Sequence, residues 1–209
     1  YGGNASYGNF NHFGKAQGFD RVESASIFCG PNAPKTWVGV YDHVFLENIE
    51  QQIKSIDEPT FHFIYTTSNH GPYKMEDSLL DYDPKKVMPA VEEDLRSNRT
   101  RNKELATYRY SDKALFRFVE AMKEAYPDSL FVVTGDHSNL FGSLNNTSLI
   151  HRDYTLRDTF CTVGLLQHPE LDSTMIATQK GTHMSLMPTI IEAIAPEGFE
   201  YYSITPVTV

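Results

Sequence analysis

The chain has 209 residues, of which 40% are hydrophobic and 12% aromatic, and its formal net charge is −9. This composition is typical of one globular domain over residues 1–209 and excludes a disordered protein. Because the chain is acidic and its basic residues do not cluster, we expect no nucleic-acid partner. An anionic substrate would need a local positive group here, such as a metal ion.

The first half of the chain carries one predicted helix and one predicted strand. Residues 1–41 are rich in Gly and Asn and indicate loops around short elements. Apolar residues at helical spacing predict a helix over 42–55, with Asp42 as its N-cap. Residues 61–67 are aromatic and β-branched, which predicts a strand that ends in the polar loop 68–73.

The second half alternates helices and strands. The clearest predicted helix covers 104–125, and its expected apolar stripe is Leu105, Tyr108, Leu115, Phe118, Val119 and Met122. The apolar run 130–134 predicts a strand buried on both faces. Residues 160–166 are a further strand candidate. A last helix is expected over 186–195, with Pro188 in its first turn. Helices between buried strands indicate an α/β fold with a mostly parallel central sheet flanked by helices.

Polar residues follow two of these strands, at the sheet edge where α/β proteins bind ligands. Asp136 and His137 come directly after 130–134, and a carboxylate with a neutral imidazole suits Zn²⁺ or Mn²⁺. On spacing alone, the alternative of a capping Asp136 and a surface His137 is equally favoured. His70, after 61–67, is a hydrogen-bond donor for a phosphate or sulfate oxygen. Without further context, a loop histidine packed on Pro72 and Tyr73 is the better interpretation.

Five segments in order resemble the alkaline-phosphatase-like superfamily, which includes sulfatases, lipoteichoic acid synthases and phosphoglycerol transferases. They cover nearly the whole chain, and each matches a short pattern of that group. The segments are Gly18-Phe19-Asp20 ("GFD"), Thr66 to Tyr73 ("T.S.H.P(Y/F)"), Tyr110 to Val119 ("YaDxaLgxFi"), Val132 to His137 ("(S/G)DH") and His183 to Ile191 ("SHxDlxPTll").

The resemblance implies a partial alkaline-phosphatase-like fold and assigns roles to matching residues. Asp136 and His137 match metal ligands, and His70 matches a contact to the substrate phosphate. The implied cofactor is a divalent metal, with Mn²⁺ first and Zn²⁺, Ca²⁺ and Mg²⁺ as alternatives. The family's nucleophile precedes the "GFD" segment, so we expect this chain, which starts at Tyr1, to be the C-terminal portion of a sulfatase-like catalytic domain.

Two further residues are expected at the substrate. Trp37 resembles the Trp of the lipoteichoic-acid-synthase-like pattern W-G-x-(K/R)-D, although this chain has an extra residue after Trp37 and lacks the basic residue. It is expected to line the substrate groove. His151 follows the Asp-His loop, where phosphoethanolamine transferases carry a second phosphate-binding histidine.

Asp112 is expected either to cap a helix or to brace the site.

Three functions remain open at this point. The first is a phosphoglycerol- or phosphoethanolamine-type transferase, or a phosphodiesterase, that acts on cell-envelope substrates through a covalent intermediate on an upstream nucleophile. Its partners would be an anionic phospho- or sulfo-ester and a lipid or glycan acceptor, and its place would be extracytoplasmic and membrane-anchored. The second is a sulfatase that uses Ca²⁺ and formylglycine. The third is an inactive fragment or non-catalytic domain.

Overall fold

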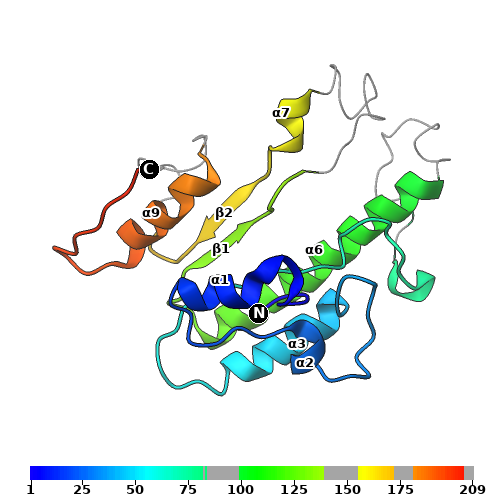
Figure 1. Cartoon of the computed structure of the whole chain (residues 1–209), viewed down its shortest axis with the longest axis horizontal. Helices are drawn as coiled ribbons and strands as arrows, with labels where there is room; N and C mark the ends of the chain where they lie inside the picture. Colours follow the sequence, from blue (N-terminus) through cyan, green and yellow to red (C-terminus); the bar gives the residue numbers. More distant parts are fainter. Residues whose placement is uncertain (82, 84–98, 139–154, 172–180, 205–209) are drawn as a thin grey trace. The chain divides into compact units, whose positions relative to one another are not determined.

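A computed structural model of the chain describes residues 1–81, 83, 99–138, 155–171 and 181–204 (Figure 1). The described elements are helices and a small sheet, which is the α/β class predicted from the sequence. The chain divides into two compact units, Tyr1–Leu166 and Gln167–Val209. The expectation of a single domain over residues 1–209 stays a prediction. Within the described residues, no helix combines the length and apolar character needed to cross a bilayer.

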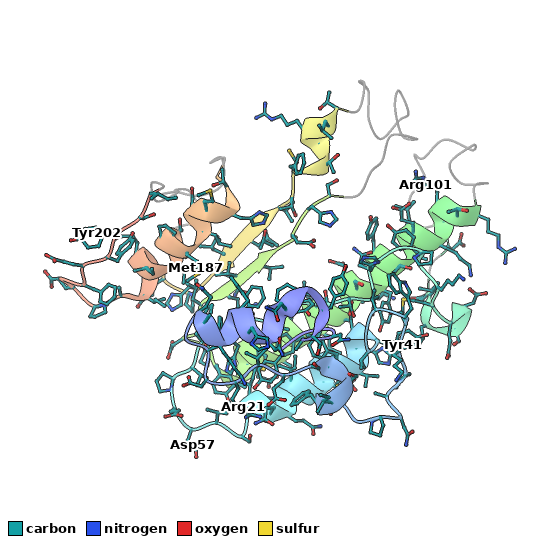
Figure 2. All side chains as sticks on the ribbon, in the orientation of Figure 1. Arg21, Tyr41, Asp57, Arg101, Met187 and Tyr202 are labelled. Carbon is teal, nitrogen blue, oxygen red and sulfur yellow. The ribbon has the colours of Figure 1, made fainter. Side chains whose placement is uncertain are left out.

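The core of the first unit lies between two helices, α3 (Asp42–Ile53) and α6 (Arg99–Ala125). From α3 come Phe45, Leu46, Ile49 and Ile53, and from α6 come Ala114, Phe118 and Met122. Figure 2 shows the side chains of this region, with Arg101 marking the start of α6. Both predicted helices are confirmed, although α6 begins five residues earlier than expected. Its buried line follows a four-residue spacing at Ala106, Tyr110, Ala114, Phe118 and Met122, while Leu105 and Leu115 lie half-buried beside it.

Short helical elements lie before α3, and another lies between α3 and α6 in the chain. They are η1 (Tyr7–Asn9), α1 (Phe10–Ala16), α2 (Ala25–Phe28) and η2 (Asp77–Leu79). The predicted strand over 61–67 is not assigned as a strand. Its backbone pairs with Tyr1, whose N donates to Phe63 O (2.9 Å) and whose O accepts from Tyr65 N (3.1 Å). The amide of Thr67 donates to the side chain of Asp42 rather than to another backbone group.

The sheet of the described residues has two strands, β1 (Phe131–Thr134) and β2 (Gly164–Gln167). Ser138 N donates to Thr159 O, and Thr134 Oγ1 donates to Val163 O, so the two segments run in opposite directions (Figure 1). Antiparallel pairs of this kind are common in the mixed sheets of α/β proteins. β2 begins four residues later than predicted, and the short helix α7 (Leu156–Thr159) precedes it.

The second unit holds α9 (His183–Ile194). This helix starts three residues earlier than expected, so Pro188 lies inside it rather than in its first turn. Its buried residues are Ser185, Pro188, Thr189 and Ile190, whereas Met187 is half exposed (Figure 2). Tyr201 returns to the helix, where its hydroxyl donates to Glu192 Oε1 (2.9 Å).

Candidate functional site

The Trp37 turn and the loop of residues 66–73 form one assembly. Thr36 N donates to Gly39 O (2.8 Å), which closes a tight turn with Trp37 at its tip. A Cβ on Gly39 would lie 2.3 Å from Thr67 Oγ1, so only glycine allows this close approach. The Trp37 indole N–H donates to Gly71 O (3.1 Å), while the Trp37 side chain stays 70% exposed.

His70 lies against Trp37 in this assembly. The two rings meet edge to face, with centroids 5.3 Å apart. His70 Nδ1 is 2.7 Å from Gly71 O, and a carbonyl oxygen only accepts, so Nδ1 carries the proton. The exposed Nε2 therefore donates to an anion only when the ring is the doubly protonated imidazolium.

The far end of the loop is held by tyrosines. Tyr73 has φ 58°, and its ring packs edge to face on Tyr108 of α6 at 6.2 Å. Burial, followed by hydrogen bonding to Tyr108, raises the pKa of the Tyr73 hydroxyl far above its ordinary value. The neutral hydroxyl is therefore retained at physiological pH. The Pro72 side of the loop is exposed.

Asp136 and His137 form a second pair, after β1. Asp136 Oδ1 accepts from His137 N (2.9 Å), and His137 Nδ1 donates to Ser138 O (2.8 Å). In the neutral ring this leaves a lone pair on Nε2, which lies 3.5 Å from Asp136 Oδ2. Two acceptor atoms so placed favour a cation between them, either a second ring proton or a metal ion. Both side chains are exposed, Asp136 by 89% and His137 by 64%.

The geometry of this pair fits a small divalent metal. Two ligand atoms each about 2.1 Å from Zn²⁺ in a tetrahedral site lie about 3.4 Å apart, close to the observed separation. The donation of Nδ1 to a backbone carbonyl is also how metal-binding histidines are usually oriented. No group of three or more His, Cys, Asp and Glu side chains gathers around one point in the described ranges. Within those ranges, Asp136 and His137 are therefore joined by no third side chain of these types.

Residues around β2 hold the Asp-His segment, and sequence patterns gave no signal for them. Gly135 N donates to Thr162 Oγ1 (3.2 Å), and a Cβ on Gly135 would lie 2.4 Å from that oxygen. Thr134 Oγ1 donates to Val163 O, and Ser138 N donates to Thr159 O. Backbone and hydroxyl contacts of this kind leave no trace in residue spacing.

The structure thus brings the expected site residues together as two pairs, Trp37 with His70 and Asp136 with His137. No hydrogen bond, ion pair or ring contact joins one pair to the other in the described part of the chain. His151 lies outside the described residues. Asp112 is exposed in the middle of α6, which runs through it, so its expected role as a helix cap is wrong.

Solved structures define the fold. The chain is similar to the lipoteichoic acid synthase LtaP from Listeria monocytogenes, with a TM-score of 0.69 and 20% identity over 91% of this chain and 47% of that one. It is also similar to a protein in the alkaline phosphatase superfamily from Vibrio parahaemolyticus, with a TM-score of 0.63 and 21% identity over 92% and 43%. The chain therefore has an alkaline-phosphatase-like α/β fold, as its motifs predicted.

Sequence relatives narrow this class. A lipoteichoic acid synthase-like protein of Bacillus subtilis, YvgJ, is 30% identical over 126 residues, which are 57% of this chain and 18% of the relative. Lipoteichoic acid synthase 1 of the same organism is 25% identical over 142 residues, or 67% and 21%. The matched segments are thus about a fifth of these relatives. The sulfatase family model matches residues 1–195, so this chain belongs to the sulfatase family.

Proposed function

We propose that this chain belongs to a metal-dependent transferase that moves a phosphoglycerol- or phosphoethanolamine-type group between cell-envelope molecules. The observation that carries the proposal is the pair of acceptor atoms, Asp136 Oδ2 and His137 Nε2, which lie 3.5 Å apart in the segment that follows β1. Sulfatase-superfamily proteins generally use divalent metals. The similarity to a lipoteichoic acid synthase and to a lipoteichoic acid synthase-like protein supports a phosphoester rather than a sulfate ester as substrate.

In this proposal Asp136 and His137 hold the metal, with Mn²⁺ as the first candidate. The metal, when bound, lowers the pKa of a hydroxyl nucleophile and offsets charge on the transferred group. His137 is kept in the correct tautomer by Ser138 O, and Gly135 gives the segment its close approach to Thr162. The nucleophile is not assigned to any residue of this chain.

His70 and Trp37 bind the group to be transferred. The His70 imidazolium donates from Nε2 to a non-bridging phosphate oxygen, and the Trp37 ring forms an apolar wall beside it. His151 is proposed as a second phosphate contact, on sequence grounds alone.

The reaction has two balanced displacements at phosphorus. The nucleophile's oxygen forms a bond to phosphorus as it loses its proton, and the bond to the lipid alcohol breaks as that alcohol gains a proton. An acceptor hydroxyl of a lipid or glycan then forms a bond to phosphorus as it loses its proton, and the bond to the nucleophile breaks as the nucleophile's oxygen regains a proton. We place this reaction outside the cytoplasm, on a membrane-anchored protein, because its substrates belong to the envelope.

Intact mass spectrometry of the protein as its host makes it tests this proposal. Incubation with Mn²⁺ and phosphatidylglycerol should add the mass of one phosphoglycerol group, and Asp136→Asn should abolish the adduct. Absence of an adduct, together with a starting mass changed by conversion of a Cys to formylglycine, would replace the transferase with a sulfatase. Absence of both would leave a non-catalytic domain as the correct account.

A further inference from the structure

A buried carboxylate lies directly beneath the loop that carries His70. Asp42 is the first residue of α3 and is 0% exposed. Its Oδ1 accepts from two consecutive loop amides, Thr67 N (3.1 Å) and Ser68 N (3.0 Å). Its Oδ2 accepts from Ser111 Oγ of α6 (2.9 Å). The expected N-cap role of Asp42 is therefore wrong: Tyr41 is the N-cap, and the Asp42 side chain serves the loop instead of its own helix.

The reverse contact makes this anchor two-sided. The amide of Asp42 lies in the first turn of α3, where backbone amides have no acceptor within the helix, and it donates to Ser68 Oγ (2.9 Å). Ser68 is itself 1% exposed. Asp42 and Ser68 thus exchange backbone and side-chain hydrogen bonds, which fixes both the distance and the orientation of the loop relative to the helix.

The charge on Asp42 explains why this anchor is rigid. An ionised carboxylate removed from water needs donors at every accessible lone pair. Asp42 has three donors and the positive end of the α3 dipole, and it makes no ion pair with a residue in the described ranges. A shift of the loop would break the hydrogen bonds from these two amides to the carboxylate. The carboxylate therefore holds the loop in the position where both bonds form.

The helices around the anchor are themselves fixed. Tyr110, next to Ser111 on α6, has its hydroxyl 3.2 Å from His43 N and 2.5 Å from His43 Nδ1. α3 and α6 share the main apolar core. The carboxylate is therefore attached to the two helices that form the main apolar core of the first unit.

His70 lies between two fixed points of its loop. Asp42 holds the amides of Thr67 and Ser68 on one side, and Trp37 holds Gly71 O on the other. His70 Nδ1 donates to that same carbonyl. We propose that Asp42 is a positioning residue that fixes the His70 loop for binding of the substrate's anionic group. The proposal rests on the proposed function in so far as it gives His70 that role.

The test uses ring-¹⁵N-histidine NMR of the full protein, with His70 assigned by loss of its signal in His70→Gln. In spectra recorded at a pH where the ring carries a single proton, wild-type His70 should carry that proton on Nδ1. In Asp42→Ala this signal should be lost or averaged, and inorganic phosphate should bind about tenfold more weakly, the effect of losing one well-placed hydrogen bond to an anion. Asp42→Asn should restore both in part, because an amide oxygen still accepts from the two loop amides but carries no charge.

Leu46→Ala is the matched control. Leu46 lies one turn further along α3 in the apolar core, so its truncation lowers the melting temperature without removing a loop contact. It should leave the His70 tautomer unchanged. In the active protein Asp42→Ala should raise KM more than it lowers kcat, and Leu46→Ala should change neither by more than about twofold.

Two results would overturn the proposal. One is an unchanged His70 signal in Asp42→Ala, and the other is an equal change in Leu46→Ala. If Asp42→Ala does not fold, Ser111→Ala decides: it should shift the His70 signal in part, and no shift would refute the proposal. If the His70 signal responds as expected but wild type binds no phosphate, the positioning role stands and the anion-binding role in the proposed function fails.

Discussion

Gly135 offers a quantitative test of how the Asp-His segment is held. In Gly135→Ala the new Cβ would lie 2.4 Å from Thr162 Oγ1, so the threonine hydroxyl must rotate away. That rotation breaks its hydrogen bond to the amide of residue 135. We expect a cost of about 1–2 kcal/mol in the free energy of unfolding, from one lost hydrogen bond and residual crowding. Thr162→Ala should cost about 1 kcal/mol, because it removes the same bond.

The double variant tells whether the cost of Gly135→Ala comes from the contact with the Thr162 hydroxyl or from an unrelated loss of stability. In the double variant the threonine hydroxyl is absent. The added Cβ then has Cβ of residue 162 as a neighbour at 3.5 Å, which is an ordinary van der Waals distance. Gly135→Ala/Thr162→Ala should therefore cost about 1 kcal/mol, well below the sum of the single variants. Urea unfolding of all four proteins measures this. Gly164→Ala in β2 is the control, because no atom lies within 4 Å of its added Cβ, and its stability should stay the same or rise. Additive costs would refute the reasoning.

Three further outcomes follow from the structure. Ile49→Ala, in the core between α3 and α6 and 0% exposed, should lower the free energy of unfolding by about 2–5 kcal/mol in urea titrations. Burial raises the pKa of the Tyr110 hydroxyl, so as pH rises the unfolded chain loses this proton before the folded protein does. The contribution of the neutral hydroxyl to the free energy of unfolding is therefore complete below about pH 10 and is lost at higher pH. Tyr110→Phe should therefore reduce the alkaline loss of stability seen by circular dichroism, while it costs about 1 kcal/mol at neutral pH through the lost contacts to His43. Trp37→Phe removes the N–H that Gly71 O accepts and should weaken phosphate binding by less than Trp37→Ala, as measured by calorimetry; equal effects would mean that the ring is not used.

Periodicity predicted the parts of the fold that bury apolar surface. α3 and α6 follow from residues that recur every three or four positions. A short apolar run predicted β1, but the expected burial of both its faces is wrong, because its first three residues are half-buried and Thr134 is exposed. The segment 61–67 has the same aromatic and β-branched composition as a strand, yet its backbone pairs with Tyr1 and then turns to Asp42. Composition reports the preference for an extended chain but not the presence of a partner strand.

The candidate site was predictable only where its residues carry chemistry. Asp136, His137 and His70 stood out because of their side chains and their places after predicted strands, and Trp37 stood out because it matches a family pattern. Asp42 was assigned to its own helix, since an N-cap and a receptor for distant amides look alike in sequence. Thr162 and Ser111 act through single hydroxyl contacts across 27 and 69 residues, and no local pattern encodes such pairs.

The most direct test of the central claim is Mn²⁺ binding to the full protein, measured by electron paramagnetic resonance. Asp136→Asn and His137→Gln are compared with Asp57→Asn, which changes an exposed carboxylate in the loop after α3 (Figure 2). The account predicts that each site variant weakens binding at least tenfold and that Asp57→Asn binds as wild type does. Equal Mn²⁺ affinity in all four proteins would contradict it.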